Sequence, residues 1–364
     1  MPQLTQLSLT QFKNYASSQF FFDKRIVGIT GLNGVGKTNF LDAIHFLCLT
    51  KSYFTKTDQA AVRHGEIGFR LEGMFERSSF TEKVSCVLRE SGKKEISVNG
   101  SSIQKQTDHI GNYPLIFIAP DDTLLITGES KVRRAYLDQL IAQLYPDYLR
   151  NLITYNKLLQ QRNALLKEMA EKKTNHSTVL AAIDQQTIPA GNYLHKARVK
   201  TINDLIPQIL RLYNKIAEKP GESTEEISIQ FNSQLDHFNF EQLLANNQQR
   251  DIFLQRTTQG PHRDDIFIGM HGQAFKVIAS QGQRKSLLFA LKLAALHILE
   301  KKNDSPPLLL LDDLFEKLDE VRVQNLIKLV FEQTVSQVFI TDTSANRLAS
   351  NLQKLNLPYQ ICCL

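Results

Sequence analysis

The residues most able to do chemistry form a phosphate-binding loop. The stretch Gly31-Leu32-Asn33-Gly34-Val35-Gly36-Lys37-Thr38-Asn39 begins with a complete G-x-x-x-x-G-K-[ST] pattern. An apolar segment precedes it and a helix-like segment follows it, which is the strand–loop–helix context that the motif requires. The glycines let backbone N–H groups point at phosphate oxygens, and the helix adds its positive N-terminal end. We therefore predict nucleotide binding, with Lys37 at the β- and γ-phosphates and Thr38 as a ligand of Mg²⁺.

Two carboxylates follow a second apolar segment. Leu308–Leu311 consists of leucine alone, and Asp312 and Asp313 come directly after it. In P-loop ATPases such a strand lies beside the phosphate loop, so Asp312 would hold the hydration shell of Mg²⁺. Asp313 would orient or deprotonate the attacking water. Alone, the pattern describes a strand and a polar turn, but together with the phosphate loop it indicates a catalytic set of Lys37, Asp312 and Asp313.

A third phosphate site is indicated by Ser280-Gln281-Gly282-Gln283, at the start of a helix that runs toward Lys302. Ser280 is a favourable N-cap residue. Its hydroxyl group, the helix N-terminus and Gly282 together form an anion site. A well-capped helix without any ligand would carry the same serine, but helix propensity argues against a glycine at that position. We interpret the segment as a second binding site for a γ-phosphate, remote in sequence from the phosphate loop.

The composition is that of an ordinary globular protein, with 42% hydrophobic and 22% charged residues in a chain of 364. This length allows two or three domains. No apolar run approaches the roughly 20 residues that span a bilayer, and the N-terminal residues do not resemble a signal peptide. The four cysteines, Cys48, Cys86, Cys362 and Cys363, lack zinc spacing. We expect reduced thiols, a cytoplasmic protein and no membrane partner.

The pattern of elements predicts an α/β head that a helical insertion divides in sequence. Candidate strands lie at 6–10, 25–30, 69–76, 82–88 and 115–119, and again at 226–231, 266–270, 274–278, 308–311 and 338–341. Between these groups the sequence has helical periodicity, with a turn at 171–177 and a break at Lys219-Pro220-Gly221. We therefore expect a head with mixed sheets, made of residues 1–120 and 222–364, and an all-helical lobe at 121–221.

The helical lobe is also the most basic part of the chain. Residues 131–215 hold fourteen Lys/Arg and six Asp/Glu, a balance of +8, whereas the whole chain carries +6. On charge alone, a solvated helical surface and a contact region for DNA phosphates explain this equally well. The candidate DNA-binding residues are Arg133, Arg134, Lys196, Arg198 and Lys200. Some of them, Arg133 and Arg134 especially, could instead form buried ion pairs.

The three phosphate motifs together resemble the ABC-type P-loop ATPase heads of the SMC-like proteins. In those heads a Ser-x-Gly-Gln signature acts on ATP held by a partner subunit, which implies that Ser280 to Gln283 act in trans. The segment Phe315-Glu316-Lys317-Leu318-Asp319 resembles the D-loop, with Asp319 as its acidic residue. The N-terminal segment Leu9–Tyr15 resembles the opening strand of such heads. Its basic residue, Lys13, is therefore expected close to ATP.

More specific motifs resemble the RecF family of bacterial recombination and repair proteins. They are the phosphate loop with Lys51-Ser52-Tyr53-Phe54, then Arg133-Arg134-x-Tyr-Leu-Asp138, Gln161-Arg162-Asn163-x-Leu-Leu166, Gly260-Pro261-His262-Arg263-Asp264-Asp265 and the Ser-Gln-Gly-Gln signature, in that order. Only 249 positions separate Gly31 from Ser280, which is too few for relatives with long coiled coils.

The resemblance implies a slow, DNA-stimulated ATPase that uses ATP and Mg²⁺. It implies an ATP-dependent homodimer that binds gapped or junction DNA, with single- and double-stranded parts. It also implies that RecO and RecR are partners in loading the RecA recombinase, in DNA repair, DNA replication and the SOS response.

Departures from the wider superfamily concern the hydrolytic details. Thr341-Asp342-Thr343 stands where ABC transporters carry a switch histidine, and Asp313 stands where they carry a glutamate. No glutamine occurs at 115–119 as a Q-loop ligand, although Asp121 or Asp122 could substitute. These departures fit slow turnover. His262 has two interpretations, as a turn or core histidine and as a residue linked to nucleotide or DNA.

Two other classes of function are compatible with some of these motifs. A transporter ATPase subunit would have its phosphate loop and signature closer together, a Q-loop and a switch histidine, and no basic helical insertion. A clamp that binds ATP but hardly hydrolyses it would carry the same motifs, and Asp313 leaves that interpretation open. Steady-state turnover with and without DNA separates the clamp from the ATPase.

Overall fold

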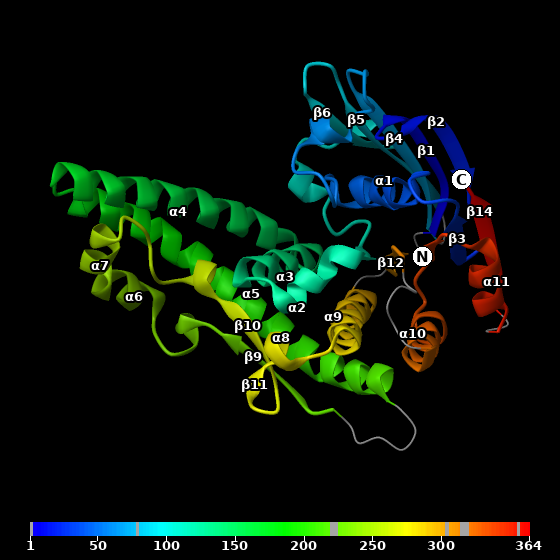
Figure 1. The fold of residues 1–364 in the computed structure, drawn as a ribbon. Coiled ribbons are helices and arrows are strands. Elements are labelled where there is room, and N and C mark those ends of the chain that lie inside the picture. The colour runs from blue at the N-terminus through cyan, green and yellow to red at the C-terminus, as the bar shows by residue number, and fades with distance from the viewer. Residues whose placement is uncertain (1–2, 78–79, 219–224, 303–305, 314–319, 355–356) are drawn as a thin grey trace. The chain divides into compact units, whose positions relative to one another are not determined.

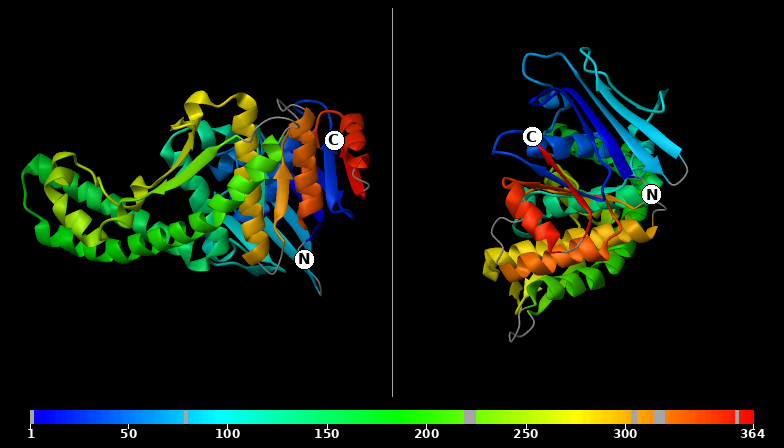
Figure 2. Two further views of the ribbon diagram at one scale, coloured as in Figure 1. Left: turned by 90° about the horizontal axis from the view of Figure 1, so that it is seen from below. Right: turned by 90° about the vertical axis from the view of Figure 1, so that its right-hand side faces the viewer.

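The computed structural model describes residues 3–77, 80–218, 225–302, 306–313, 320–354 and 357–364 (Figures 1 and 2). The chain divides into two compact units, one of residues 1–122, 211–224 and 281–364 and the other of residues 123–210 and 225–280. The second unit therefore differs from the all-helical lobe expected at 121–221. It includes the strands between 227 and 274, because these pair with one another and pack against the helices of that unit.

The first unit contains two sheets with helix α1 (Lys37–Leu49) between them (Figure 1). One sheet is antiparallel, in the order β2-β1-β4-β5-β6-β7, and the other is parallel, in the order β14-β3-β13-β12-β8. The antiparallel strands are β1 (Gln3–Phe12), β2 (Tyr15–Phe21), β4 (Phe69–Arg77), β5 (Phe80–Leu88), β6 (Lys94–Val98) and β7 (Ser101–Ser102). The parallel strands are β3 (Ile26–Thr30), β8 (Leu115–Ile118), β12 (Leu308–Leu311), β13 (Val338–Asp342) and β14 (Tyr359–Cys363).

Strands β3, β8, β12 and β13 of the parallel sheet are buried along their whole length, which explains their apolar character. Val27 and Ile29 of β3 belong to the core that includes α1. Gly28 faces the other side, where a Cβ atom would lie 2.5 Å from Leu348 Cδ2 of helix α11 (Ala345–Gln353). Glycine at this position therefore allows α11 to approach the sheet closely. Helix α9 (Gln281–Lys302) packs against β8 and against α10 (Glu320–Gln333).

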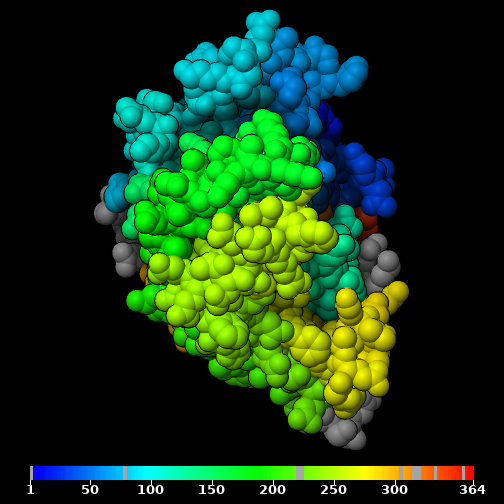
Figure 3. Space-filling model, turned by 90° about the vertical axis from the view of Figure 1, so that its left-hand side faces the viewer, coloured from blue at the N-terminus to red at the C-terminus, as the bar shows by residue number. Residues whose placement is uncertain are grey.

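The second unit is mainly helical. Its elements are α2 (Leu124–Thr127), α3 (Ser130–Leu144), α4 (Pro146–Lys172), most of α5 (Ser177–Ala217), β9 (Ile227–Asn232), α6 (Phe240–Asn246), α7 (Gln248–Phe253), β10 (Asp265–Met270), β11 (Gln273–Ala274) and α8 (Phe275–Ile278). The two long helices and the turn between them confirm the sequence prediction. Figure 3 shows the face on which α6 and α7, in yellow-green, lie beside the green surface of α4 and α5.

The strand predicted at 274–278 is wrong. Only Gln273–Ala274 pairs with β10, and Phe275–Ile278 forms the single helical turn α8. A short apolar run does not distinguish a strand from a helical turn by periodicity. Strands β2 and β6 went unpredicted because polar residues interrupt their apolar residues on a half-exposed sheet. Within the described residues, we find no helix with the length and apolar character that crossing a membrane requires.

Candidate nucleotide-binding site

The phosphate loop leads from strand β3 into helix α1, as the sequence predicts. The turn between β1 and β2 supports it: Asn14 Nδ2 donates to the Val35 carbonyl at 2.8 Å, and the Tyr15 hydroxyl donates to the Gly36 carbonyl at 3.1 Å. Burial raises the pKa of Tyr15, so this hydroxyl stays protonated. Gly36 has a φ of +117°, and a Cβ atom there would lie 2.5 Å from Asn14 Nδ2. Only glycine fits this position.

Lys37 extends along its own loop. Its ammonium group donates to the carbonyls of Gly31 at 2.8 Å and Leu32 at 3.0 Å. The side chain is buried, and these contacts fix its charge inside the curve of the loop. Phosphate oxygens that bind the backbone N–H groups of such a loop would meet this ammonium group.

Thr38 and the two predicted carboxylates meet at the carboxyl ends of neighbouring strands. The Thr38 hydroxyl donates to Asp312 Oδ2 at 2.9 Å. The Thr341 hydroxyl, from β13, donates to Asp312 Oδ1 at 2.8 Å and accepts the N–H of Asp313 at 2.9 Å. Burial raises the pKa of Asp312, and the hydrogen bonds from Thr341 and Thr38 and the charge of Lys37 oppose that shift. A hydroxyl and a carboxylate oxygen side by side are the hard ligands that Mg²⁺ takes, so these residues fit the predicted ion.

A pocket of about 530 Å³ adjoins this corner. It is lined by Asn33, Gly34, Gly36, Lys37, Thr38, Asn39, Asp313, Thr343 and Arg347. The volume lies within the roughly 300–1,000 Å³ of small-molecule sites. Residues of the loop predicted to bind phosphate therefore share one pocket with the carboxylate predicted to orient water.

Arg347 enters this pocket from the first turn of helix α11. Its Nε donates to Asp342 Oδ2 at 3.0 Å and its Nη2 to Asp342 Oδ1 at 2.6 Å. Asp342 ends strand β13 and also accepts the N–H of Ser344 at 2.8 Å, which fixes the start of the helix. The ion pair therefore holds a guanidinium group at the wall of the pocket that α11 provides.

Comparison with known proteins agrees with this site. The sequence matches the family described as "RecF/RecN/SMC N terminal domain" over residues 3–357. It is 37% identical, over 358 residues, to the DNA replication and repair protein RecF of Flavobacterium johnsoniae, covering 98% of this chain and 99% of that one. Its identity to the RecF of Parabacteroides distasonis is 35%, covering 98% and 96%.

The chain belongs to the RecF family. A structure of the recombination mediator protein RecF with ATP, from the RecFOR pathway, has a TM-score of 0.85 to this chain at 27% identity. It covers 94% of this chain and 92% of that one. A Smc head domain from Pyrococcus furiosus has a TM-score of 0.56 at 16% identity, covering 96% and 92%, and shares the fold. The fold is therefore that of an ABC-type ATPase head, as predicted.

Two residues that the resemblance to SMC-like heads and the comparison with ABC transporters singled out lie as follows. Lys13 Nζ pairs with Asp42 of α1 at 2.6 Å and lies over the rings of Phe12 and Phe54. Its contact with ATP stays a prediction. Asp122, a suggested substitute for a Q-loop glutamine, is buried and pairs with Lys292 of α9 at 2.9 Å. That pairing favours a structural role for Asp122.

The signature segment leads directly into α9. Ser280 is exposed, and Gln281, Gly282 and Gln283 form the first turn of the helix. Of the described residues, those that line the pocket include no member of this segment. Asp319, the D-loop residue predicted from the resemblance to SMC-like heads, lies outside the residues that the structure describes.

Three of the five predicted DNA-binding residues hold the second unit together. Arg133 donates to both oxygens of Asp265, at 2.7 and 2.9 Å. Arg198 is buried and pairs with Asp138 and Asp264, each at 2.8 Å. The positions of Arg133 and Arg198 therefore favour ion pairing over DNA contact. The third, Arg134, donates to the Asp264 carbonyl at 2.7 Å. Lys196 and Lys200 are the remaining two, and both lie on α5 with exposed side chains.

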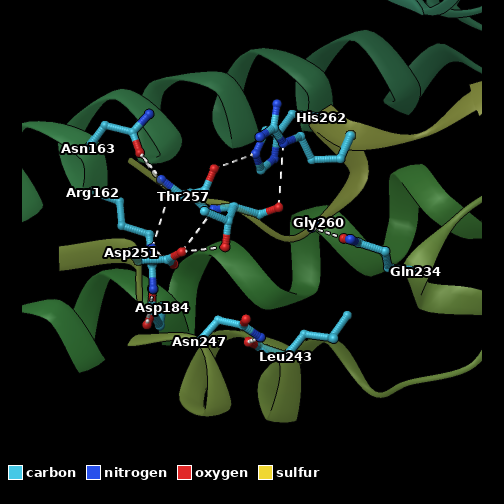
Figure 4. A network of polar contacts seen from close by, with 12 residues as sticks. Arg162, Asn163, Asp184, Gln234, Leu243, Asn247, Asp251, Thr257, Gly260 and His262 are labelled. Carbon is cyan, nitrogen blue, oxygen red and sulfur yellow. Dashed lines mark hydrogen bonds and ion pairs between the residues drawn. The ribbon is translucent and has the colours of Figure 1, made fainter. Parts of the chain in front are cut away.

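His262 belongs to a polar network inside the second unit (Figure 4). Its Nδ1 accepts from the Tyr155 hydroxyl at 2.7 Å, and its Nε2 donates to the Thr257 carbonyl at 3.1 Å. Burial lowers the pKa of His262 to about 4, so the imidazole is neutral. Arg162 continues the network through ion pairs with Asp184 at 2.7 Å and Asp251 at 2.6 Å. These contacts favour the core interpretation of this RecF motif.

Sequence reasoning missed Asn14, Thr341 and Arg347 as parts of the site. Asn14 lies in a segment compared with the family only for Lys13. Thr341 and Asp342 were noted only because no histidine stands there. The one available signal was topological, since residues that follow a parallel strand next to β3 reach the same edge of the sheet as the phosphate loop.

Proposed function

We propose that this chain is an ATP-dependent DNA-binding protein of recombinational repair and replication, and that it hydrolyses ATP slowly. The observation that carries the proposal is the pocket that Lys37, Thr38 and Asp313 line together, in a chain of the RecF family. A relative of the same fold has been described with ATP.

The residues of the pocket have distinct roles in this proposal. The loop N–H groups and Lys37 bind the phosphates and offset their charge. Thr38 and Asp312 would hold Mg²⁺, which supplies further positive charge at the terminal phosphates. Asp313 orients the attacking water or takes its proton. Its side chain is one methylene shorter than the glutamate of ABC transporters, so the carboxylate reaches less far and turnover is slow.

The signature residues act on the nucleotide of a second copy. The first turn of α9 lies outside the pocket lining, so a two-fold partner would supply this anion site from its own chain. ATP would then close two equivalent sites at once. Dimerisation would depend on ATP.

The proposed DNA and protein partners are inferred from membership of the RecF family. We propose binding of gapped or junction DNA, with single- and double-stranded parts, and cooperation with RecO and RecR in loading RecA. The names of the relatives, which are DNA replication and repair proteins, support this assignment. The same proposal places the protein in the cytoplasm.

Sedimentation of the purified protein tests the proposal most directly. With ATP and a gapped duplex we expect a dimer bound to DNA, and without ATP a monomer. Turnover measured in parallel separates a slow ATPase from a clamp that does not hydrolyse. A chain that stays monomeric and ignores DNA in the presence of ATP contradicts the proposed function.

A further inference from the structure

Strand β13 brings its following residues to the terminal phosphates of the proposed nucleotide. In the parallel sheet β13 lies between β3, which leads into the phosphate loop, and β12, which leads into Asp312 and Asp313. Parallel strands end at the same edge, so residues after β13 lie between the loop and the carboxylates. Thr343 and Arg347 line the pocket there, together with Lys37 and Asp313.

The ion pair that holds Arg347 is asymmetric in its exposure. The Asp342 side chain is 1% exposed and the Arg347 side chain is 54% exposed. Asp342 is fixed further by the N–H of Ser344, and Arg347 Nη2 also lies 3.4 Å from the Thr343 hydroxyl. A guanidinium group is planar and has five N–H donors, so one edge can be held by a carboxylate while the group binds a phosphate. The buried Asp342 carboxylate therefore holds the half-exposed Arg347 guanidinium group in an orientation in which it can contact a phosphate oxygen.

We propose that Arg347 binds the terminal phosphate of ATP and that Asp342 positions it. This inference rests on the proposed ATP-binding function and adds a cation that no phosphate motif of the sequence contains. ABC transporters carry a switch histidine after this strand, whereas this chain has Thr341-Asp342-Thr343 at the corresponding position and an arginine four residues after Thr343. Arg347 would distinguish ATP from ADP, because only ATP has a phosphate between the loop and Asp313.

Equilibrium binding of ATP and ADP to the full chain tests the proposal. Arg347→Gln should weaken ATP binding by roughly tenfold or more, the loss expected for one charge-assisted hydrogen bond. ADP binding should change by less than about threefold, since ADP lacks the contacted phosphate. The ATP affinity of Arg347→Lys should lie between those of wild type and Arg347→Gln, because lysine keeps the positive charge but lacks the planar set of N–H donors. Equal losses for ATP and ADP, or no loss for ATP, would overturn the assignment.

A matched control is available on the antiparallel sheet. Arg70 has a similarly exposed side chain, at 56%, and also pairs with a carboxylate two residues away in β4, Glu72. Arg70→Gln should leave both affinities unchanged. A loss of ATP selectivity in that variant would show that the effect comes from net charge and not from the position of Arg347.

Two further variants separate the failure of this inference from the failure of the proposed function. Lys37→Ala should weaken both nucleotides, and if it does not, the pocket is not the nucleotide site. If Lys37→Ala weakens both while Arg347→Gln keeps wild-type selectivity, only the role of Arg347 fails. Asp342→Asn retains the acceptor for Ser344 and should reduce ATP selectivity, as Arg347→Lys does. Equal weakening of ATP and ADP by Asp342→Asn would make Asp342 merely structural.

Discussion

The ammonium group of Lys292, in helix α9, lies 2.9 Å from the carboxylate of Asp122, in the turn after strand β8. Both side chains are nearly inaccessible, at 3% and 9% exposure. Lys292 also donates to the Phe117 carbonyl at 2.6 Å, and the Tyr53 hydroxyl donates to Asp122. Tyr53 is tied in turn to Asp42 of α1 through its backbone N–H, at 2.6 Å. Polar contacts therefore join the helix of the phosphate loop to the helix of the signature.

Removing the cation of this pair should destabilise the first unit strongly. Lys292→Met leaves Asp122 buried without its partner, which costs about 3–5 kcal/mol in comparable ion pairs. Burial already lowers the pKa of Lys292, but the pairing with Asp122 opposes that shift. Adding Asp122→Asn to Lys292→Met should recover part of the stability, because the amide keeps hydrogen-bonding capacity without the charge. Urea unfolding measures both, and a double variant no more stable than Lys292→Met contradicts the ion-pair account.

The same pair shows why part of the site could not be predicted from the sequence. The phosphate loop and the carboxylates after β12 are local patterns, so their residues and even the bounds of β12 were predictable. Lys292 and Asp122 are 170 positions apart, and no local pattern marks them as partners. Arg198 was likewise indistinguishable in sequence from the more accessible Lys200. Only the fold decides which basic residue of a helix faces a buried carboxylate.

The Thr341 hydroxyl should be essential for the geometry of both carboxylates. Thr341→Val removes the donor to Asp312 and leaves the N–H of Asp313 without its acceptor, which should cost about 1–3 kcal/mol of stability. ATP turnover should fall by roughly tenfold or more, since a rise of about 1.4 kcal/mol in the activation barrier has that effect. Nucleotide affinity should change little. Thr341→Ser should restore turnover, and a Thr341→Val variant with wild-type turnover would contradict this role.

Stability should decrease in mild acid because His262 is kept neutral in the folded state. Its pKa is about 4 when folded, against about 6.5 for an unfolded chain. Between these values the unfolded state binds a proton that the folded state does not, so unfolding becomes easier as pH falls. This residue contributes up to about 1.4 kcal/mol per pH unit over that window. The unfolding free energy of His262→Gln should depend less on pH, whereas that of the exposed His64→Gln should follow wild type.

DNA binding by the basic stretch 131–215 should depend on Lys196 and Lys200, which remain accessible, and not on the paired arginines. Replacing both with glutamine should weaken binding to all duplex sequences alike. It should also reduce the salt slope, that of log binding constant against log salt concentration, by about 0.9 for each DNA phosphate that the variant no longer neutralises. Lys167→Gln with Lys172→Gln is a control, because these exposed lysines pair with Glu171 and Glu168. An unchanged salt slope for the Lys196 and Lys200 variant would remove both residues from the DNA-binding surface.

Dimerisation should require ATP and pass through Ser280. Ser280 is exposed at the start of α9, two residues after Ile278, and Val277 and Ile278 have exposed apolar side chains, at 69% and 36% exposure. A second copy would cover this surface while the helix N-terminus meets the partner's nucleotide. Ser280→Arg would place bulk and charge where the partner's phosphate loop must approach.

The Ser280→Arg variant should therefore fold and bind ATP as a monomer, because none of the described residues that line the pocket belongs to the signature. It should lose ATP-dependent dimers, hydrolysis and tight DNA binding together, since all three need the closed pair of sites. Ser280→Ala is the milder comparison, which keeps the helix N-terminus but not the hydroxyl, and should weaken the dimer without abolishing it. Light scattering with ATP decides the matter: if Ser280→Arg dimerises like wild type, the signature does not act across a dimer in this protein.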